Sequence, residues 1–173
     1  MKNVIVLLLV LKVSSFFAQH TDHSTQRNSI ENMLNHWHLA AAEADYDGYF
    51  GCFSENAIYI GTDPTENWNL AAFKAFSKPF FESGKAWHFV ALDRNIYLSA
   101  DGKFAWFDEL MDTQMLLCRG SGVLILEGKD WKIKHYVLSI AVPNEHTKEV
   151  VATKKLFDQS LIRDLKRKNL VEK

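Results

Sequence analysis

The sequence predicts an α+β fold in which three N-terminal helices lie on the concave face of a curved antiparallel sheet, with a further helix at the C-terminus. Two patterns carry this prediction. Apolar residues recur at helical spacing in the first half, whereas from Trp87 onward they alternate with a period of two. Because three helices cannot cover both faces of such a sheet, we expect them on one face, with a pocket between the layers.

The helices are predicted from the spacing of large apolar side chains. Ser29 can cap a first helix that runs to about Ala44. A second, short helix is expected over 46–53, followed by a short strand over 57–60. The third helix is predicted over 68–82, with Pro79 bending or ending its last turn.

Four strands are predicted after Gly84, over 87–99, 103–112, 117–127 and 131–142. Asp101-Gly102 is typical of a tight hairpin, and Pro143 ends the sheet. From about Thr147 an amphipathic helix carries Lys and Arg on its far side. We therefore divide the chain into a domain over 29–143 and a basic C-terminal helical segment over 144–173.

The first 18 residues are predicted to be a secretory signal peptide. A short basic start precedes an apolar run from Val4 to Leu11, and Ala18 is a small residue suited to cleavage. The run is shorter than the ~20 residues of a membrane span, so we expect export to the periplasm or outside the cell without a stable membrane anchor. A buried N-terminal helix is the alternative. Residues 19–28 are expected to form a polar leader.

The charge balance does not favour nucleic-acid binding. After Ala18 the chain has 18 basic and 21 acidic side chains, and the basic ones concentrate beyond Thr147. Cys52 and Cys118 are the only cysteines. Export would allow a disulfide, but two separate buried thiols are the preferred prediction.

Three segments resemble the SnoaL-like branch of the nuclear transport factor 2 superfamily. The resemblance covers roughly Ile30 to Pro143 and implies a cone-shaped fold, whose relatives include ketosteroid isomerases, polyketide cyclases, dehydratases and non-catalytic modules. It rests on Ala44-Asp45 leading into Tyr49-Phe50, on the loop Gly61-Thr62-Asp63-Pro64 followed by Glu66 and Trp68, and on Ala105-Trp106-Phe107, Arg119-Gly120-Ser121-Gly122-Val123 and Trp131 to His135 with Ser139. No Asp aligns with the general base of the isomerases, and their paired acids are also missing.

Strand alternation predicts which side chains face the pocket. On the last strand Trp131 and His135 would point inward, because Lys132 and Lys134 between them favour the solvent-exposed face. Pairing across a turn near 112–115 would place Glu109 opposite Arg119 and Phe107 opposite Ser121. A slip of one residue would move side chains to the other face and exchange Glu109 for Asp108.

This arrangement suggests proton transfer by Glu109 or Asp108 together with His135. Apolar walls raise the pKa of a carboxyl group, and a neighbouring Arg119 would keep Glu109 ionised. A carboxylate and an imidazole across a small cavity suit abstraction of a proton beside a carbonyl. The alternatives are a cross-strand ion pair between Glu109 and Arg119, and a satisfied core histidine at position 135.

Further pocket residues are expected on the helices and on the first strand. His38 could reach the cavity, and Tyr59 and Trp68 would form walls, although Trp68 could instead pack beneath the third helix. His36 and His38 lie about 200° apart on a helix and cannot share one ion. We expect neither a metal site nor a cofactor.

Three functions remain open from the sequence. The first is binding of a small, largely apolar molecule in the cone pocket. The second is an isomerase, cyclase or dehydratase type of enzyme that uses the groups above. The third is a homodimeric interaction module that pairs through an outer sheet face with Tyr136, Leu138 and Ile140 and docks a partner with its basic tail. The alternative for the tail is a helix that closes the cone.

Overall fold

The structure is a computed structural model that describes residues 23–171. The predicted signal peptide and residues 19–22 of the predicted leader lie outside the described residues. The elements in order are α1 (Ser24–Ala42), α2 (Tyr46–Gly51), β1 (Phe53–Ile60), β2 (Asn67–Asn69), α3 (Leu70–Glu82), β3 (Phe89–Leu98), β4 (Phe104–Thr113), β5 (Leu116–Glu127), β6 (Asp130–Ile140), the 3-10 turn η1 (Asn144–His146) and α4 (Thr147–Val171). The α+β class is confirmed.

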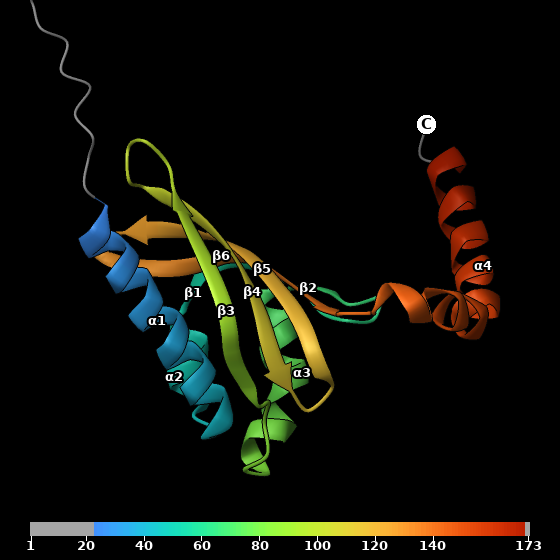
Figure 1. Cartoon of the computed structure of the whole chain (residues 1–173), viewed down its shortest axis with the longest axis horizontal. Coiled ribbons are helices and arrows are strands. Elements are labelled where there is room, and N and C mark those ends of the chain that lie inside the picture. The colour runs from blue at the N-terminus through green and yellow to red at the C-terminus, as the bar shows by residue number, and fades with distance from the viewer. Residues whose placement is uncertain (1–22, 172–173) are drawn as a thin grey trace, which may run out of the picture.

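The sheet has six strands and is mixed, in the order β2-β1-β6-β5-β4-β3. The antiparallel meander from β3 to β6 was predicted, but β1 also joins it and runs parallel to β6. The helices α1 and α3 lie against the sheet, where α1 contacts β3 and β6, and α3 contacts β1 and β2. Figure 1 shows these helices gathered on one side of the curved strands.

Helix α1 begins at Ser24, so residues 24–28 are helical and not part of a loose leader. Ser29 therefore does not cap it; the cap position is His23, without a side-chain cap bond. Polar side chains fix this added turn on the sheet, since Gln26 Nε2 donates to the carbonyl of Gly102 at 3.0 Å and Arg27 donates to the carbonyl of Ile96. Tertiary hydrogen bonds from polar side chains therefore hold the extra turn in place. Because these residues are polar, they add nothing to the apolar periodicity from which the helix was predicted.

The β4–β5 hairpin closes through a two-residue turn, Gln114-Met115, with Thr113 paired to Leu116. The predicted register is consequently wrong by one residue: Glu109 pairs with Gly120, and Arg119 pairs with Leu110. The inward positions on β4 are occupied by buried Ala105, Phe107, Glu109 and Met111, whereas Arg119 is exposed on the outer face.

Strand β6 contains a bulge at Lys134, because Val123 pairs with His135 while Leu124 pairs with Ile133. A bulge adds one residue to a strand and reverses the alternation beyond it. Trp131 and Ile133 point inward as predicted, but after the bulge Tyr136 and Leu138 are the buried residues. The predicted inward His135 and outward Tyr136 are both wrong for this reason.

The core consists largely of aromatic rings between the helices and the sheet. Trp37 is fully buried and packs edge-on against Tyr136 with ring centroids 4.8 Å apart. Tyr59 and Phe73 stack at 3.9 Å. Cys52 and Cys118 are separate buried thiols, and burial raises the pKa of Cys52 to about 11, which makes it a poor nucleophile.

Helix α4 does not close the cone. Its main contacts are with η1, and Figure 1 shows it standing apart from the sheet and the N-terminal helices. Leu156, Phe157 and Leu165 are at least half exposed. Within residues 23–171 no helix combines the length and apolar character of a membrane span.

Candidate functional site

Two polar and aromatic centres lie between the helices and the sheet, and the first is a closed cluster around Glu109. This side chain points inward from β4 and is fully buried. Its neighbour across the hairpin is Gly120, where a Cβ would collide with the hydroxyl oxygen of Tyr136. The glycine therefore leaves the space through which the Tyr136 hydroxyl reaches the carboxylate, donating to Oε1 at 3.1 Å.

Arg94 on β3 holds the other oxygen of Glu109. Its Nε donates to Oε2 at 2.9 Å, and its Nη2 lies 2.9 Å from the same atom. The remaining nitrogen, Nη1, donates to Glu31 and Asn35 of α1, each at 2.7 Å. Arg94 thus ties α1 to the inner face of the sheet. Its side chain is buried, and its guanidinium contacts two carboxylates, those of Glu31 and Glu109.

His38 on α1 completes the cluster. Its Nε2 lies 3.2 Å from Oε1 of Glu109, close enough for an ion pair but not aligned for a hydrogen bond. Burial alone would raise the pKa of Glu109, but the contact with His38 and the charge of Arg94 outweigh burial, and the pKa of Glu109 is lowered. Burial, and then the Glu109 charge, raise the pKa of Tyr136 well above 10.0, so its hydroxyl remains a donor.

This cluster is suited to holding the fold together. Glu109 is ionised at neutral pH, accepts from Arg94 and Tyr136, and is fully buried. A general base needs a pKa near the working pH and a path to substrate. Glu109 has a lowered pKa and no exposed surface, so its chemistry is that of a buried anchor for α1, β3 and β6.

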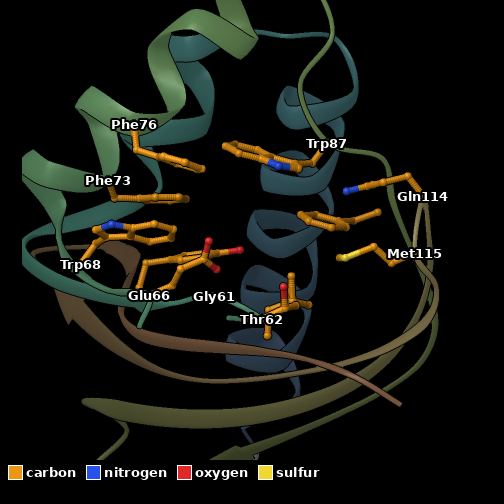
Figure 2. Close-up of a pocket in the computed structure, with 12 residues that line it drawn as sticks. Gly61, Thr62, Glu66, Trp68, Phe73, Phe76, Trp87, Gln114 and Met115 are labelled. Atoms are coloured by element: carbon orange, nitrogen blue, oxygen red, sulfur yellow. The ribbon is translucent and has the colours of Figure 1, made fainter. Parts of the chain in front are cut away.

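The second centre is an open pocket of about 130 Å³, shown in Figure 2. Trp68, Phe73 and Phe76 stand on one side, and Trp87 and Met115 stand on the other. The full lining is Tyr59, Gly61, Thr62, Glu66, Trp68, Phe73, Phe76, Trp87, Phe89, Gln114, Met115 and Leu138. Half of these residues are aromatic, and aromatic walls with a few polar groups are typical of a small-molecule site.

The polar side of the pocket comes from the turn between β1 and β2. Thr65 donates from its backbone nitrogen to Oδ1 of Asp63 at 2.8 Å, and its hydroxyl donates to the same atom at 2.5 Å. These bonds lower the pKa of Asp63. Glu66 packs over Gly61, where a Cβ would collide with its carboxylate, and one carboxylate oxygen accepts from the Asp63 nitrogen at 3.1 Å. The turn thus fixes Glu66 at the pocket.

Aromatic rings separate the two centres. Phe89 lines the pocket and contacts the ring of His38 at 5.8 Å, and Tyr59 lines the pocket and lies 5.5 Å from the ring of Tyr136. The Glu109 cluster therefore lies behind the pocket wall and does not form part of the lining.

The residues predicted as a site fall into three groups. Tyr59 and Trp68 line the pocket, and Trp68 stacks on Phe73 with ring centroids 5.6 Å apart. Glu109 and His38 belong to the closed cluster. The other predicted residues lie elsewhere: Phe107 and Trp131 are in the core outside the pocket lining, and Asp108, Arg119 and His135 are on the outer face.

Sequence reasoning missed Arg94, Tyr136 and most of the pocket walls. An arginine in a strand with an otherwise apolar inward face was a usable signal for a buried ion pair. Phe73 and Phe76 were predicted only as a helical face, and the bulge at Lys134 concealed Tyr136. Gln114 and Met115 form a two-residue turn, whereas the predicted register assumed a turn near 112–115.

Comparison with known proteins gives a family. The model of the SnoaL-like domain matches residues 30–143. Among curated proteins none matches significantly. The structure is similar to a nuclear transport factor 2-like protein of unknown function from Pseudomonas putida, with 13% identity, a TM-score of 0.61, and coverage of 70% of this chain and 91% of that one.

Two further structures show the same fold. A protein of unknown function from Mycobacterium tuberculosis has 12% identity and a TM-score of 0.62, over 73% of this chain and 78% of that one. A candidate scytalone dehydratase from Novosphingobium aromaticivorans has 11% identity and a TM-score of 0.61, over 69% and 87%. The family match, together with the cone of helices on a curved sheet, shows that this chain belongs to the SnoaL-like domain family of the nuclear transport factor 2-like fold.

Proposed function

We propose that the protein binds one small, flat, largely apolar molecule in the pocket between α3, the β1–β2 turn and the β4–β5 turn. The observation that carries this proposal is the lining itself, in which aromatic rings surround a few polar groups that could orient a ligand. Trp68 stacks on both Phe73 and Phe76, with ring centroids 5.6 and 4.6 Å apart, so these three rings form one continuous aromatic wall against which a ring could pack.

The size of the pocket limits which ligands can bind. Its volume is about 130 Å³, and a cavity of roughly 150 Å³ holds a single benzene ring. Drug-sized or steroid-sized molecules need roughly 300–1,000 Å³. We therefore expect a ligand with one ring or a short apolar chain, and we expect steroids and long lipids to be excluded.

The enzyme alternative has less support from this geometry. It needs titratable groups that converge on the pocket, and Glu109 is sealed behind the wall while His135 and Asp108 face outward. Glu66 is the carboxylate of the lining, and no histidine of the described part of the chain lines the pocket with it. Binding without proton transfer is the function that these positions support best.

We also propose, from the composition of residues 1–18, that the chain is exported. The basic start, the short apolar run and Ala18 support this proposal. Mass determination of the N-terminus after expression in a bacterial host tests it, and a mature chain that still starts at Met1 would contradict it.

A thermal-shift titration with neutral single-ring molecules, such as phenol and benzyl alcohol, tests the binding proposal. Ligands that bind only the native state raise the melting temperature with concentration. We expect a saturable increase for these probes and none for progesterone. The absence of any shift with all single-ring probes would contradict the proposal.

A pair of α3 variants separates pocket binding from binding elsewhere. Phe76 lines the pocket and is 42% exposed, whereas Phe80 is 44% exposed and is not part of the lining. Because both are half exposed, removing either ring should have a similar, modest effect on stability. We expect Phe76→Ala to weaken the thermal shift and Phe80→Ala to retain it.

A further inference from the structure

The charge of the pocket comes from one residue. Glu66 is half-buried, and Figure 2 shows its carboxylate oxygens turned toward the middle of the pocket. Among the described residues of the lining there is no lysine, arginine or histidine. The other polar side chains of the lining include Tyr59, Thr62 and Gln114, which are neutral and do not offset the negative charge.

Within residues 23–171 the position of Glu66 is fixed by a backbone hydrogen bond and by packing, without an ion pair to a cationic side chain. Its Oε2 accepts from the backbone nitrogen of Asp63, a neutral donor, at 3.1 Å. Packing over Gly61 holds the carboxylate beside the apolar walls. A carboxylate beside aromatic surface is partly desolvated, so a ligand cation placed against it gains more than it would in bulk water. A ligand anion at the same place would be repelled and would also lose hydration.

We infer that the pocket selects a small arylalkylamine in its ammonium form, with the ring against the aromatic wall that includes Trp68, Phe76 and Trp87 and the nitrogen against Glu66. The inference rests on the proposed binding function and adds the sign of the ligand's charge. The ring fills a cavity of about 130 Å³, and the ammonium group lies at the polar side formed by the β1–β2 turn.

Three nearly isosteric probes test this inference by calorimetric titration of the full chain at neutral pH: benzylamine, benzyl alcohol and benzoate. We expect benzylamine to bind about tenfold or more tightly than benzoate, with benzyl alcohol between them. Rising salt should weaken benzylamine binding and leave benzyl alcohol unaffected.

Substitution of Glu66 identifies the group responsible. Glu66→Gln keeps the shape and removes the charge, so it should abolish the preference for benzylamine and retain benzyl alcohol binding. Glu127→Gln, an exposed carboxylate at the end of β5, makes the same change in net charge and should retain the preference. Equal affinities for benzylamine and benzoate, with benzyl alcohol bound, would overturn the inference and leave the binding function intact. Failure of all three probes would overturn both.

A second, independent inference concerns α4. One face of this helix carries Val150, Phe157, Leu161 and Leu165, with Phe157 53% and Leu165 52% exposed. Lys154 and Asp158 form a 3.2 Å ion pair on the same face. An ion pair there disfavours insertion into lipid, because both charges would have to leave water. The helix carries seven basic and three acidic side chains, which also disfavours pairing with another α4.

The outer face of the sheet carries exposed aromatic rings and acidic side chains, which complement the apolar and basic side chains of α4. Tyr97 and Trp106 stack there at 5.7 Å, and both are more than 40% exposed. Asp93, Asp108 and Asp112 lie along the same β3–β4 seam, and residues 23–146 contain 16 acidic and 10 basic side chains. The 25-residue helix is about 37 Å long and the 10-residue strands β3 and β4 are about 33 Å long, so the seam can follow most of the helix.

We propose that α4 of one copy lies on the outer β3–β4 seam of a second copy, in a two-fold exchange that gives a homodimer. Figure 1 shows α4 directed away from its own sheet, as such an exchange requires. Basic side chains of α4 would meet the three aspartates, and Phe157 and Leu161 would meet Tyr97 and Trp106. The contact is self-complementary and closes at two copies.

Sedimentation velocity of the full chain over a range of concentrations tests this proposal. We expect a dimer that weakens with salt, and both Leu161→Glu on α4 and Trp106→Glu on the sheet should make it monomeric. Leu156→Glu is the matched control, because this 82% exposed residue points away from the face and should leave the dimer unchanged. A monomer at all concentrations, a dimer lost only with the α4 variant, or binding of the chain to anionic lipid vesicles in its place would each overturn the proposal.

Discussion

The hydroxyl of Tyr136 donates a 3.1 Å hydrogen bond to Oε1 of Glu109, and both residues are fully buried. The bond joins β6 to β4 across β5, because β5 presents Gly120 between them. Arg94 and His38 approach the same carboxylate from β3 and α1. One buried charge therefore organises four elements.

Replacing Glu109 by Gln should destabilise the protein strongly. The variant leaves Arg94 buried with Glu31 as its remaining carboxylate partner, and breaking a buried ion pair on one side costs about 3–5 kcal/mol. Urea denaturation measures the free energy of unfolding. Glu127→Gln, which changes an exposed carboxylate at the end of β5, is the control and should change it by about 0.5 kcal/mol or less. Equal losses for both variants would show that the cluster has no special role.

Replacing Gly120 by Ala should destabilise the fold by about 1–3 kcal/mol, because the added methyl group meets the Tyr136 hydroxyl in a packed core. The companion variant Tyr136→Phe removes that hydroxyl. In a double-mutant cycle the two losses should be less than additive, because Tyr136→Phe removes the closest of the clashes that the alanine methyl group makes. Strictly additive losses of stability would show that Gly120 is not needed to accommodate the Tyr136 hydroxyl.

The Glu109 cluster should make stability fall with acid. The folded pKa of Glu109 is lowered from its ordinary value of 4.5, so the unfolded chain binds more protons in the interval between the two values. The contribution is fully present above about pH 4.5 and is lost as the pH falls through the lower folded value. Urea midpoints between pH 7 and 3 should decline more steeply for the parent than for Glu109→Gln. Parallel curves would contradict this linkage.

Removing residues 147–173 should leave the stability of the remaining domain nearly unchanged when the protein is dilute. The main contacts of α4 are with η1, and its apolar residues are exposed. We expect a melting temperature within about 2 °C of the full chain at low protein concentration. A large decrease under those conditions would show that the helix packs on its own domain.

The elements that could be predicted are those in which apolar residues recur at a regular local spacing. The strand pattern from Trp87 to Val142 gave four strands whose ends agree with the structure to within about two residues. Inward placement of Glu109 was predicted from its pairing with the strand that carries Arg119. That register is wrong by one residue, but Glu109 is still buried because it alternates with Ala105, Phe107 and Met111 along β4. A resemblance of three short segments to the SnoaL-like family was sufficient for the fold, and the match over residues 30–143 confirms it.

The errors arose where a single residue changes the pairing. The two-residue turn at Gln114-Met115 and the bulge at Lys134 each shift a register by one, which moves Arg119 and His135 to the outer face and Tyr136 into the core. Alternation carries no information about such an inserted residue. The pocket was also hard to foresee, because its walls come from α3, two turns and β6, which only the folded chain brings together.

The most direct test of the pocket uses the methyl groups of methionine. Met115 lines the pocket, whereas Met33 lies on α1 away from it. In protein with 13C-labelled methionine methyl groups, titration with benzyl alcohol should shift the Met115 signal saturably and leave the Met33 signal in place. Equal small drifts of both signals, or a Met115 signal that does not move, would contradict ligand binding in this pocket.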